Sequence, residues 1–112
     1  MLVVDDDPGM LDTMVDILTE MNFKVTTASD GNQAFALVRA GSFDAVLMDI
    51  KMPGIDGIEA LKRIKATKPG AKVIIMTAHA SDDVVLSARK EGASTVLYKP
   101  IELTTIEASL KK

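Results

Sequence analysis

Several residue types are scarce in this chain of 112 residues, and each absence removes a class of protein. There is no cysteine, which excludes disulfide frameworks, thiolate metal sites and cysteine nucleophiles. There is no tryptophan, only one tyrosine and three phenylalanines, and the net charge is −3, so we expect no direct binding to nucleic acid. No apolar run approaches the ~18 residues of a membrane-spanning helix, and the start lacks the basic segment of a secretory signal. We therefore expect a soluble, cytoplasmic single domain over residues 1–112, with no membrane partner.

Basic residues are missing from the beginning of the chain. Residues 1–23 contain six acids and no lysine or arginine, although 26% of the whole chain is charged. The acids are Asp5, Asp6, Asp7, Asp12, Asp16 and Glu20. A globular chain with 47% hydrophobic residues does not need such a cluster for solubility, so the acidic start calls for a functional explanation.

Short apolar runs alternate with longer amphipathic segments. The runs predict strands over residues 1–5, 24–28, 44–50, 71–77 and 94–98, of which those over 1–5 and 44–50 are expected to be buried. Apolar residues at helical spacing predict helices over residues 8–22 and 30–40, with Phe35 buried in the second, and from Ile58 to before Pro69. Two further helices are predicted, one from an N-cap at Ser81 to near Gly92 and one that presents Leu103, Ile106 and Leu110 on one face.

This alternation favours parallel βαβ units. Because such crossovers are right-handed, successive helices can cover both faces of one sheet. We expect a three-layer, doubly wound α/β sandwich with a five-stranded parallel sheet and five helices. The flavodoxin-like strand order 2-1-3-4-5 is preferred over a Rossmann order, since five strands fit the smaller fold.

Polar residues stand at the carboxyl ends of the predicted strands, where open parallel sheets bind ligands. The first strand ends in Asp5 and Asp6, the third in Asp49, the fourth in Thr77 and the fifth in Lys99. The expected strand order brings these ends into one pocket. Three carboxylates close together repel one another, and a hard divalent cation such as Mg²⁺ would relieve this repulsion.

The chemistry of this set is that of phosphoryl transfer. A carboxylate can act as a covalent nucleophile toward phosphorus, and Asp49, on a central strand, is the best candidate. Asp5 and Asp6 are better placed as Mg²⁺ ligands. Lys99 and the Thr77 hydroxyl would neutralise charge on the phosphoryl oxygens. Asp7 precedes a proline at the first helical position, so we expect it to cap the first helix.

Four segments carry a family resemblance: VVDDDPGM at the start, LMDIKMPGIDG around Asp49, VIIMTAHA at Thr77 and YKP near the end. In this order they resemble the receiver domain of two-component response regulators, over essentially the whole chain. Within that family, MDIKMPGIDG and MTAHA are similar to the receivers of NtrC-like regulators.

The resemblance implies that Asp49 is the phosphoacceptor of a phosphorelay, supplied by a histidine kinase, a phosphotransfer protein or a small phosphodonor. It implies Mg²⁺ as cofactor, bound by Asp5, Asp6, Asp49 and the backbone carbonyl of Lys51. Such a chain is not an enzyme in its own right, but takes part in its own phosphorylation and slow dephosphorylation.

The resemblance also implies a conformational switch. Thr77 and Tyr98 match the switch pair, and Lys99 matches the lysine that contacts the phosphoryl group. The switching surface would comprise the fourth helix, the fifth strand and the fifth helix, and would engage a second copy, an output domain or a downstream protein. The family's cis peptide bond would fall between Lys99 and Pro100.

Other residues receive simpler interpretations. His79, the single histidine, is at most a modulator of dephosphorylation. Gly54 and Gly57 belong to no phosphate-binding fingerprint and are interpreted as turn glycines with positive φ. Met10 and Met14 could help to dock a kinase helix.

Two other functions stay open at this point. One is a small aspartate-nucleophile phosphatase of the haloacid-dehalogenase type, although Lys51 stands where such an enzyme needs a second aspartate. The other is an interaction module of the same fold that is not phosphorylated. The chain is either a single-domain regulator or a piece of a larger one.

Overall fold

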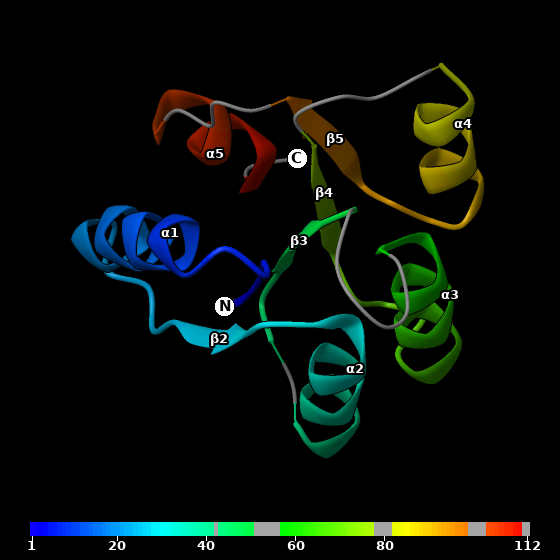
Figure 1. The fold of residues 1–112 in the computed structure, drawn as a ribbon, viewed down its shortest axis with the longest axis horizontal. Coiled ribbons are helices and arrows are strands. Elements are labelled where there is room, and N and C mark those ends of the chain that lie inside the picture. Colours follow the sequence, from blue (N-terminus) through cyan, green and yellow to red (C-terminus); the bar gives the residue numbers. More distant parts are fainter. Residues whose placement is uncertain (42, 51–56, 78–81, 99–102, 111–112) are drawn as a thin grey trace.

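Strands and helices alternate along the chain (Figure 1). The computed structural model describes residues 1–41, 43–50, 57–77, 82–98 and 103–110. Within them the strands are β1 (Leu2–Val4), β2 (Thr26–Ala28), β3 (Val46–Asp49), β4 (Val73–Thr77) and β5 (Thr95–Tyr98). The helices are α1 (Pro8–Glu20), α2 (Gly31–Ala40), α3 (Gly57–Thr67), α4 (Asp82–Lys90) and α5 (Leu103–Leu110).

The strands form one parallel sheet in the order β2-β1-β3-β4-β5, which confirms the predicted topology. The central strand β3 lies between β1 and β4, with Leu47 opposite Val3 on one side and Ile74 on the other. Because all strands run the same way, the carboxyl ends of β1, β3 and β4 share one edge of the sheet. That edge carries Asp5, Asp6, Asp49 and Thr77.

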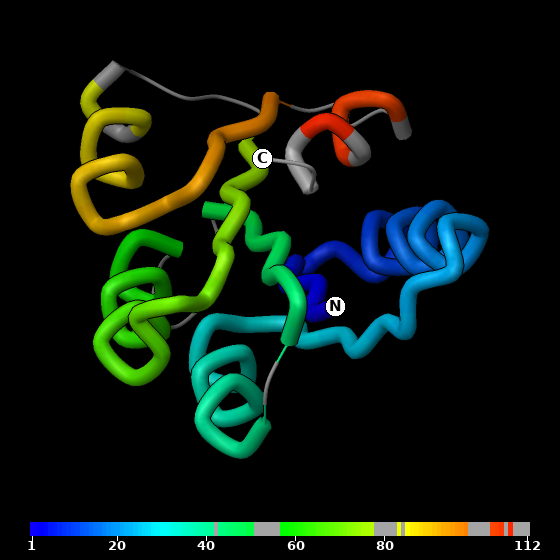
Figure 2. The backbone as a smooth tube through the Cα atoms, turned by 180° about the vertical axis from the view of Figure 1, so that it is seen from behind, coloured from blue at the N-terminus to red at the C-terminus, as the bar shows by residue number. Residues whose placement is uncertain are grey.

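Alternate residues of each strand supply two separate hydrophobic cores, because successive side chains point to opposite faces of a sheet. Helices α1 and α5 cover one face, with Met14, Leu18 and Ile106 packed among Val3, Leu47, Ile74 and Met76. Helices α2, α3 and α4 cover the other face. Figures 1 and 2 show these layers from opposite sides, with α1 and α5 together on one side of the sheet. The expected three-layer sandwich is confirmed.

The strands are shorter than predicted. The predicted strand over 24–28 is confined to Thr26–Ala28, although the amino group of Met1 still donates to the Lys24 carbonyl at 2.7 Å. Asp5 follows β1, and its backbone N–H still donates to the Ala28 carbonyl at 3.1 Å. No helix among the described residues has the length and apolarity needed to cross a membrane.

Two predicted helix faces need correction. Met14 is fully buried in the core beneath α1, so it is not available to dock a partner helix, whereas Met10 is only partly buried. Phe35 on α2 is partly exposed, with the Arg39 guanidinium 5.6 Å from its ring centroid. The buried residues of α2 are Gly31, Ala34 and Val38, so the predicted burial of Ala34 and Val38 is confirmed and that of Phe35 is wrong.

Replacement of the buried Leu47 by alanine should destabilise the fold strongly. Leu47 is fully buried at the centre of the sheet, and truncation of a buried leucine costs about 2–5 kcal/mol of unfolding free energy. Leu86→Ala is the matched control, because that side chain is 65% exposed and its loss should change stability by no more than about 0.5 kcal/mol. Urea unfolding measures both, and equal effects would contradict the core described here.

Candidate functional site

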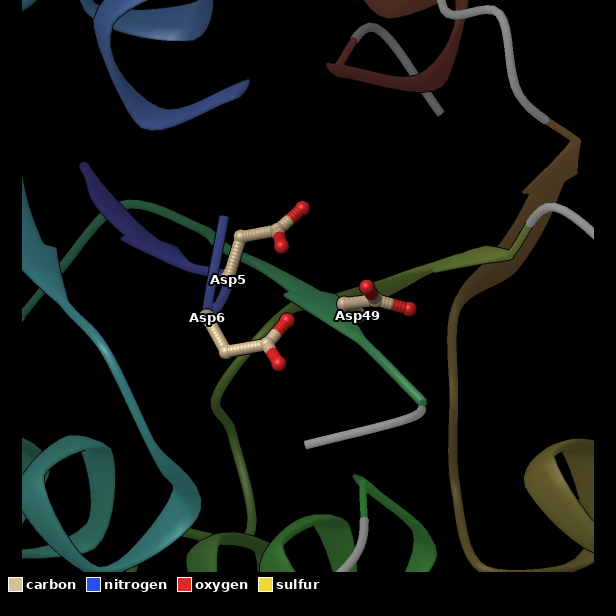
Figure 3. A group of neighbouring side chains, drawn as sticks. All are labelled: Asp5, Asp6 and Asp49. Atoms are coloured by element: carbon tan, nitrogen blue, oxygen red, sulfur yellow. The ribbon is translucent and has the colours of Figure 1, made fainter. Parts of the chain in front are cut away.

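Three carboxylates converge at the carboxyl edge of the sheet. Asp5 and Asp6 follow β1, and Asp49 is the last residue of the neighbouring strand β3. One carboxylate oxygen from each lies within 4.8 Å of the other two (Figure 3). The predicted convergence of residues that are 43 or more positions apart in sequence is therefore observed.

The three acids differ in exposure. Asp5 is fully buried, and its carboxylate accepts a hydrogen bond from the backbone N–H of Asp7 at 3.0 Å. Asp49 is 8% exposed, whereas Asp6 is exposed to solvent. Two acids of the cluster, Asp5 and Asp49, are therefore buried, whereas Asp6 is accessible to an incoming molecule.

Asp49 is carried by a firmly held strand end. Its strand is flanked by β1 and β4, and Asp49 itself pairs with Met76. The backbone N–H of the next residue, Ile50, donates to the Met76 carbonyl at 3.3 Å. A carboxylate at the end of a central strand is positioned more accurately than one on a loop.

Thr77 and Tyr98 lie side by side at the same edge. Thr77 ends β4, one residue beyond the partner of Asp49, and its side chain is buried. It pairs with Tyr98 on β5, whose side chain is 57% exposed. The pair therefore consists of one buried residue next to the acidic cluster and one solvent-exposed residue on the last strand of the sheet.

Several predicted residues lie outside the described residues. They are Lys51, Gly54, His79, Ser81, Lys99 and Pro100. The predicted roles of Lys99 as a phosphoryl contact and of the Lys51 carbonyl as a metal ligand stay predictions.

Asp7 caps α1, as predicted. Its backbone is extended, and its carboxylate accepts a hydrogen bond from the Gly9 N–H at 2.9 Å, with Pro8 in the first helical position. This bond satisfies one of the backbone donors left unpaired at a helix start. Asp7, the third aspartate in succession, therefore stabilises the start of α1.

The interpretation of Gly57 as a turn glycine with positive φ is wrong. Among the glycines that the structure describes, Gly92 is the one with positive φ. Gly57 is the first residue of α3, is buried, and touches the backbone at the end of β3. A side chain at this position would meet the Ile50 Cα at 2.5 Å. The residue type alone does not distinguish a glycine that is needed for positive φ from one that is needed for the close approach of two backbone segments.

The donor set fits a hard divalent cation. Carboxylate oxygens are the ligands that Mg²⁺ and Ca²⁺ prefer, at about 2.0–2.1 Å and 2.3–2.6 Å respectively. Two oxygens on opposite sides of one ion are therefore about 4–5 Å apart, which matches a cluster whose oxygens lie within 4.8 Å of one another. An ion here would also offset the repulsion among three like charges.

The doubly wound sheet has the strand order 2-1-3-4-5, which is that of flavodoxin-like proteins. The acidic cluster lies at its switch point, between β1 and β3, and is a candidate metal site. Comparison with known families narrows this class. The family model for the response regulator receiver domain matches residues 1–111. The chain belongs to the response regulator receiver domain family.

Two curated relatives illustrate the range of the family. The transcriptional regulatory protein ZraR of Escherichia coli K12 is 40% identical over 111 residues, which is 99% of this chain and 25% of ZraR. The chain thus spans about a quarter of the length of that relative. The sporulation initiation phosphotransferase F of Bacillus subtilis is 36% identical over 99% of this chain and 90% of its own length.

Solved structures of receiver domains match the whole fold. The CheY-like receiver domain protein of Methanospirillum hungatei JF-1 has a TM-score of 0.94 and 30% identity, over 98% of this chain and 88% of its own. The receiver domain of the sensor histidine kinase PA1611 of Pseudomonas aeruginosa PAO1, with magnesium coordinated in its active-site cleft, has a TM-score of 0.90 and 28% identity, over 98% and 92% of the two chains. The beryllofluoride-activated NtrC4 receiver domain dimer has a TM-score of 0.91 and 31% identity, over 98% and 91%.

The capping role of Asp7 makes a distinct prediction for stability. Asp7→Ala should lower the unfolding free energy by about 1 kcal/mol, whereas Asp7→Asn should cost little, since asparagine caps helices as well as aspartate does. Asp12→Ala, at an exposed site within the same helix, is the control. If Asp7→Ala proves as stable as the parent in urea unfolding, the cap contributes nothing.

Proposed function

We propose that this receiver domain is the phosphoacceptor of a two-component phosphorelay, with Asp49 as the residue that is phosphorylated. The observation that carries the proposal is the convergence of Asp5, Asp6 and Asp49 at the carboxyl edge of the sheet. Membership of the receiver family supports it, because the relatives include a phosphotransferase and a transcriptional regulator.

Asp5, Asp6 and Asp49 would hold Mg²⁺, together with the backbone carbonyl of Lys51. The similar receiver domain of PA1611 has magnesium in its active-site cleft, which supports this choice of ion. When bound, the ion supplies positive charge that neutralises phosphoryl oxygens. The protein itself contributes the fixed strand ends that keep the three acids together.

In the proposed reaction, a carboxylate oxygen of Asp49 attacks the phosphorus of a phosphohistidine on the partner. A new P–O bond forms as the P–N bond breaks, and the imidazole nitrogen leaves with the bonding electron pair and takes up a proton from solvent. The Thr77 hydroxyl and the Lys99 ammonium stabilise the phosphoryl oxygens of the product. The domain is thus a phosphoacceptor that takes part in its own phosphorylation and slow dephosphorylation, rather than an enzyme acting on other substrates.

Phosphorylation would switch a surface formed by α4, β5 and α5. The added negative charge draws the Thr77 hydroxyl toward the phosphoryl group, and Tyr98 moves inward into the space left behind. The outward, 57% exposed position of Tyr98 suits the unphosphorylated state of such a switch. Moving a switch from 1:99 to 99:1 takes about 5.5 kcal/mol, which a few charge-assisted hydrogen bonds can supply.

The partners of this surface would be a second copy of the chain, an output domain or a downstream protein. Leu86 on α4 and Tyr98 on β5 are the large, well-exposed hydrophobic side chains among the described residues, and both belong to the proposed surface. The NtrC4 receiver, which is similar to this chain, forms a dimer when activated. The phosphoryl donor would be a histidine kinase or a phosphotransfer protein in the cytoplasm.

The alternative of a haloacid-dehalogenase phosphatase is not supported, since the chain belongs to the receiver family. The alternative of a receiver fold that is not phosphorylated predicts no covalent adduct, so the labelling experiment distinguishes it from the proposed function.

Acetyl phosphate with Mg²⁺ should add one phosphoryl group to the protein, detected by intact mass. Asp49→Asn should abolish the adduct, because the amide is not a nucleophile toward phosphorus. Asp44→Asn is the matched control, since Asp44 is an exposed acid just before the same strand, at the opposite edge of the sheet. Undiminished labelling of Asp49→Asn, or an unlabelled parent, would overturn the proposal.

Mg²⁺ should stabilise the fold through the same acids. At a concentration 100 times its dissociation constant, a ligand that binds only the folded state adds about 2.7 kcal/mol to the unfolding free energy. Asp6→Asn should remove most of this gain, yet be more stable than the parent in EDTA, because it relieves repulsion within the cluster. Thermal unfolding with and without Mg²⁺ measures both effects.

Asp12→Asn serves as the control for this series, since Asp12 is exposed on α1 and lies outside the cluster. It should retain the full response to Mg²⁺. A parent protein whose melting temperature is the same in Mg²⁺ and in EDTA would show that the cluster binds no such ion.

A further inference from the structure

We propose that Gly57 is a positioning residue for the acidic site, because its lack of a side chain lets α3 press against the strand end that carries Asp49. This inference rests on the proposed function and deepens it. Gly57 touches neither an ion nor a phosphoryl group; it acts through the backbone of Asp49 and Ile50.

The contact between α3 and the end of β3 is a backbone-to-backbone contact. A Cβ atom on Gly57 would lie 2.5 Å from the Ile50 Cα, 2.7 Å from the Asp49 carbonyl oxygen and 2.9 Å from the Ile50 carbonyl oxygen. All three atoms belong to the main chain, so no side-chain rotation can relieve the overlap. A methyl group at this position must therefore displace either the first turn of α3 or the strand end.

The strand end is held from two sides. The Gly57 N–H donates to the Ile50 carbonyl at 2.7 Å, and the Ile50 N–H donates to the Met76 carbonyl of β4 at 3.3 Å. Ile50 is buried in the core under α2, α3 and α4. Ile50, the residue after Asp49, is thus held by β4 through its N–H and by α3 through its carbonyl. These two bonds hold the strand end that carries Asp49, one of the three acids of the cluster.

The displacement is large for a site of this kind. Moving the Ile50 Cα from 2.5 Å to the 3.0 Å that real contacts rarely undercut takes at least about 0.5 Å. Binding and catalytic groups must be held within about 0.5 Å of their productive positions. Changes in the residues that support metal ligands typically weaken metal affinity about 10- to 100-fold.

Gly70 provides a matched control. It lies in the turn between α3 and β4, at the other end of the same helix, and a Cβ atom there would meet no atom within 4 Å. Gly57→Ala and Gly70→Ala therefore make the same chemical change at either end of α3, and differ in whether the methyl group meets the strand that carries Asp49.

The test compares Gly57→Ala, Gly70→Ala and the parent, at a temperature at which circular dichroism shows all three to be folded. Isothermal titration gives the dissociation constant for Mg²⁺, and intact mass gives the initial rate of labelling by acetyl phosphate at saturating Mg²⁺. We expect Gly57→Ala to weaken Mg²⁺ binding about tenfold or more and to slow labelling about tenfold or more. Gly70→Ala should match the parent in both.

The outcomes separate this inference from the function on which it rests. A parent that neither binds Mg²⁺ nor accepts a phosphoryl group overturns the proposed function. A parent that does both, with a Gly57→Ala variant of equal Mg²⁺ affinity and labelling rate, overturns the positioning role alone. A Gly57→Ala variant that is merely less stable, with both quantities unchanged when folded, also overturns it.

A second measurement covers the case in which Gly57→Ala does not fold. In proton–nitrogen correlation spectra of the parent titrated with Mg²⁺, the Gly57 amide resonance should shift along the same binding curve as that of Asp6, since its N–H donates to the carbonyl of Ile50, the residue after Asp49. The Gly70 resonance should stay in place. An unshifted Gly57 amide in a parent that binds Mg²⁺ would overturn the inference.

Discussion

Mutual repulsion among three carboxylates is the constraint around which this domain is organised. Asp5, Asp6 and Asp49 each place an oxygen within 4.8 Å of the other two, and two unit charges at that distance repel by about 1 kcal/mol even in water. The protein tolerates this because the acids stand at the carboxyl ends of adjacent strands, β1 and β3, whose residues are buried. Hydrophobic packing thus holds together charges that would separate in a flexible chain, and the result is a candidate site for a cation.

Two groups of residues flank the acidic cluster, one at the start of α1 and one at the ends of β4 and β5. Asp7 caps α1, and its backbone N–H donates to the buried Asp5 carboxylate, so the helix start and the site share one turn. On the opposite side, Thr77 and Tyr98 pair across β4 and β5 and connect a buried hydroxyl with an exposed ring. In the proposed function, chemistry at Asp49 is transmitted along this pair to the surface formed by α4, β5 and α5.

Much of this could be predicted from the sequence because the signals are local. Apolar runs such as VLM before Asp49 mark strands buried on both faces, and alternation with amphipathic segments restricts the topology to parallel crossover units. The strand order then brings Asp5, Asp6 and Asp49 together without further assumptions. The errors concern how neighbouring elements pack against one another, which local patterns do not specify. Phe35 has the helical spacing of a core residue, yet small residues fill that face of α2, and Gly57 looks like a turn glycine, although its importance lies in a backbone 2.5 Å from where its Cβ would be.

The most direct test of the central claim is a crystal structure of the protein grown with Mn²⁺, a hard divalent ion whose anomalous scattering locates it without ambiguity. The account predicts one strong peak per chain, within bonding distance of carboxylate oxygens from Asp5, Asp6 and Asp49. A peak bound elsewhere on the domain, with these three side chains turned away from one another, would contradict it.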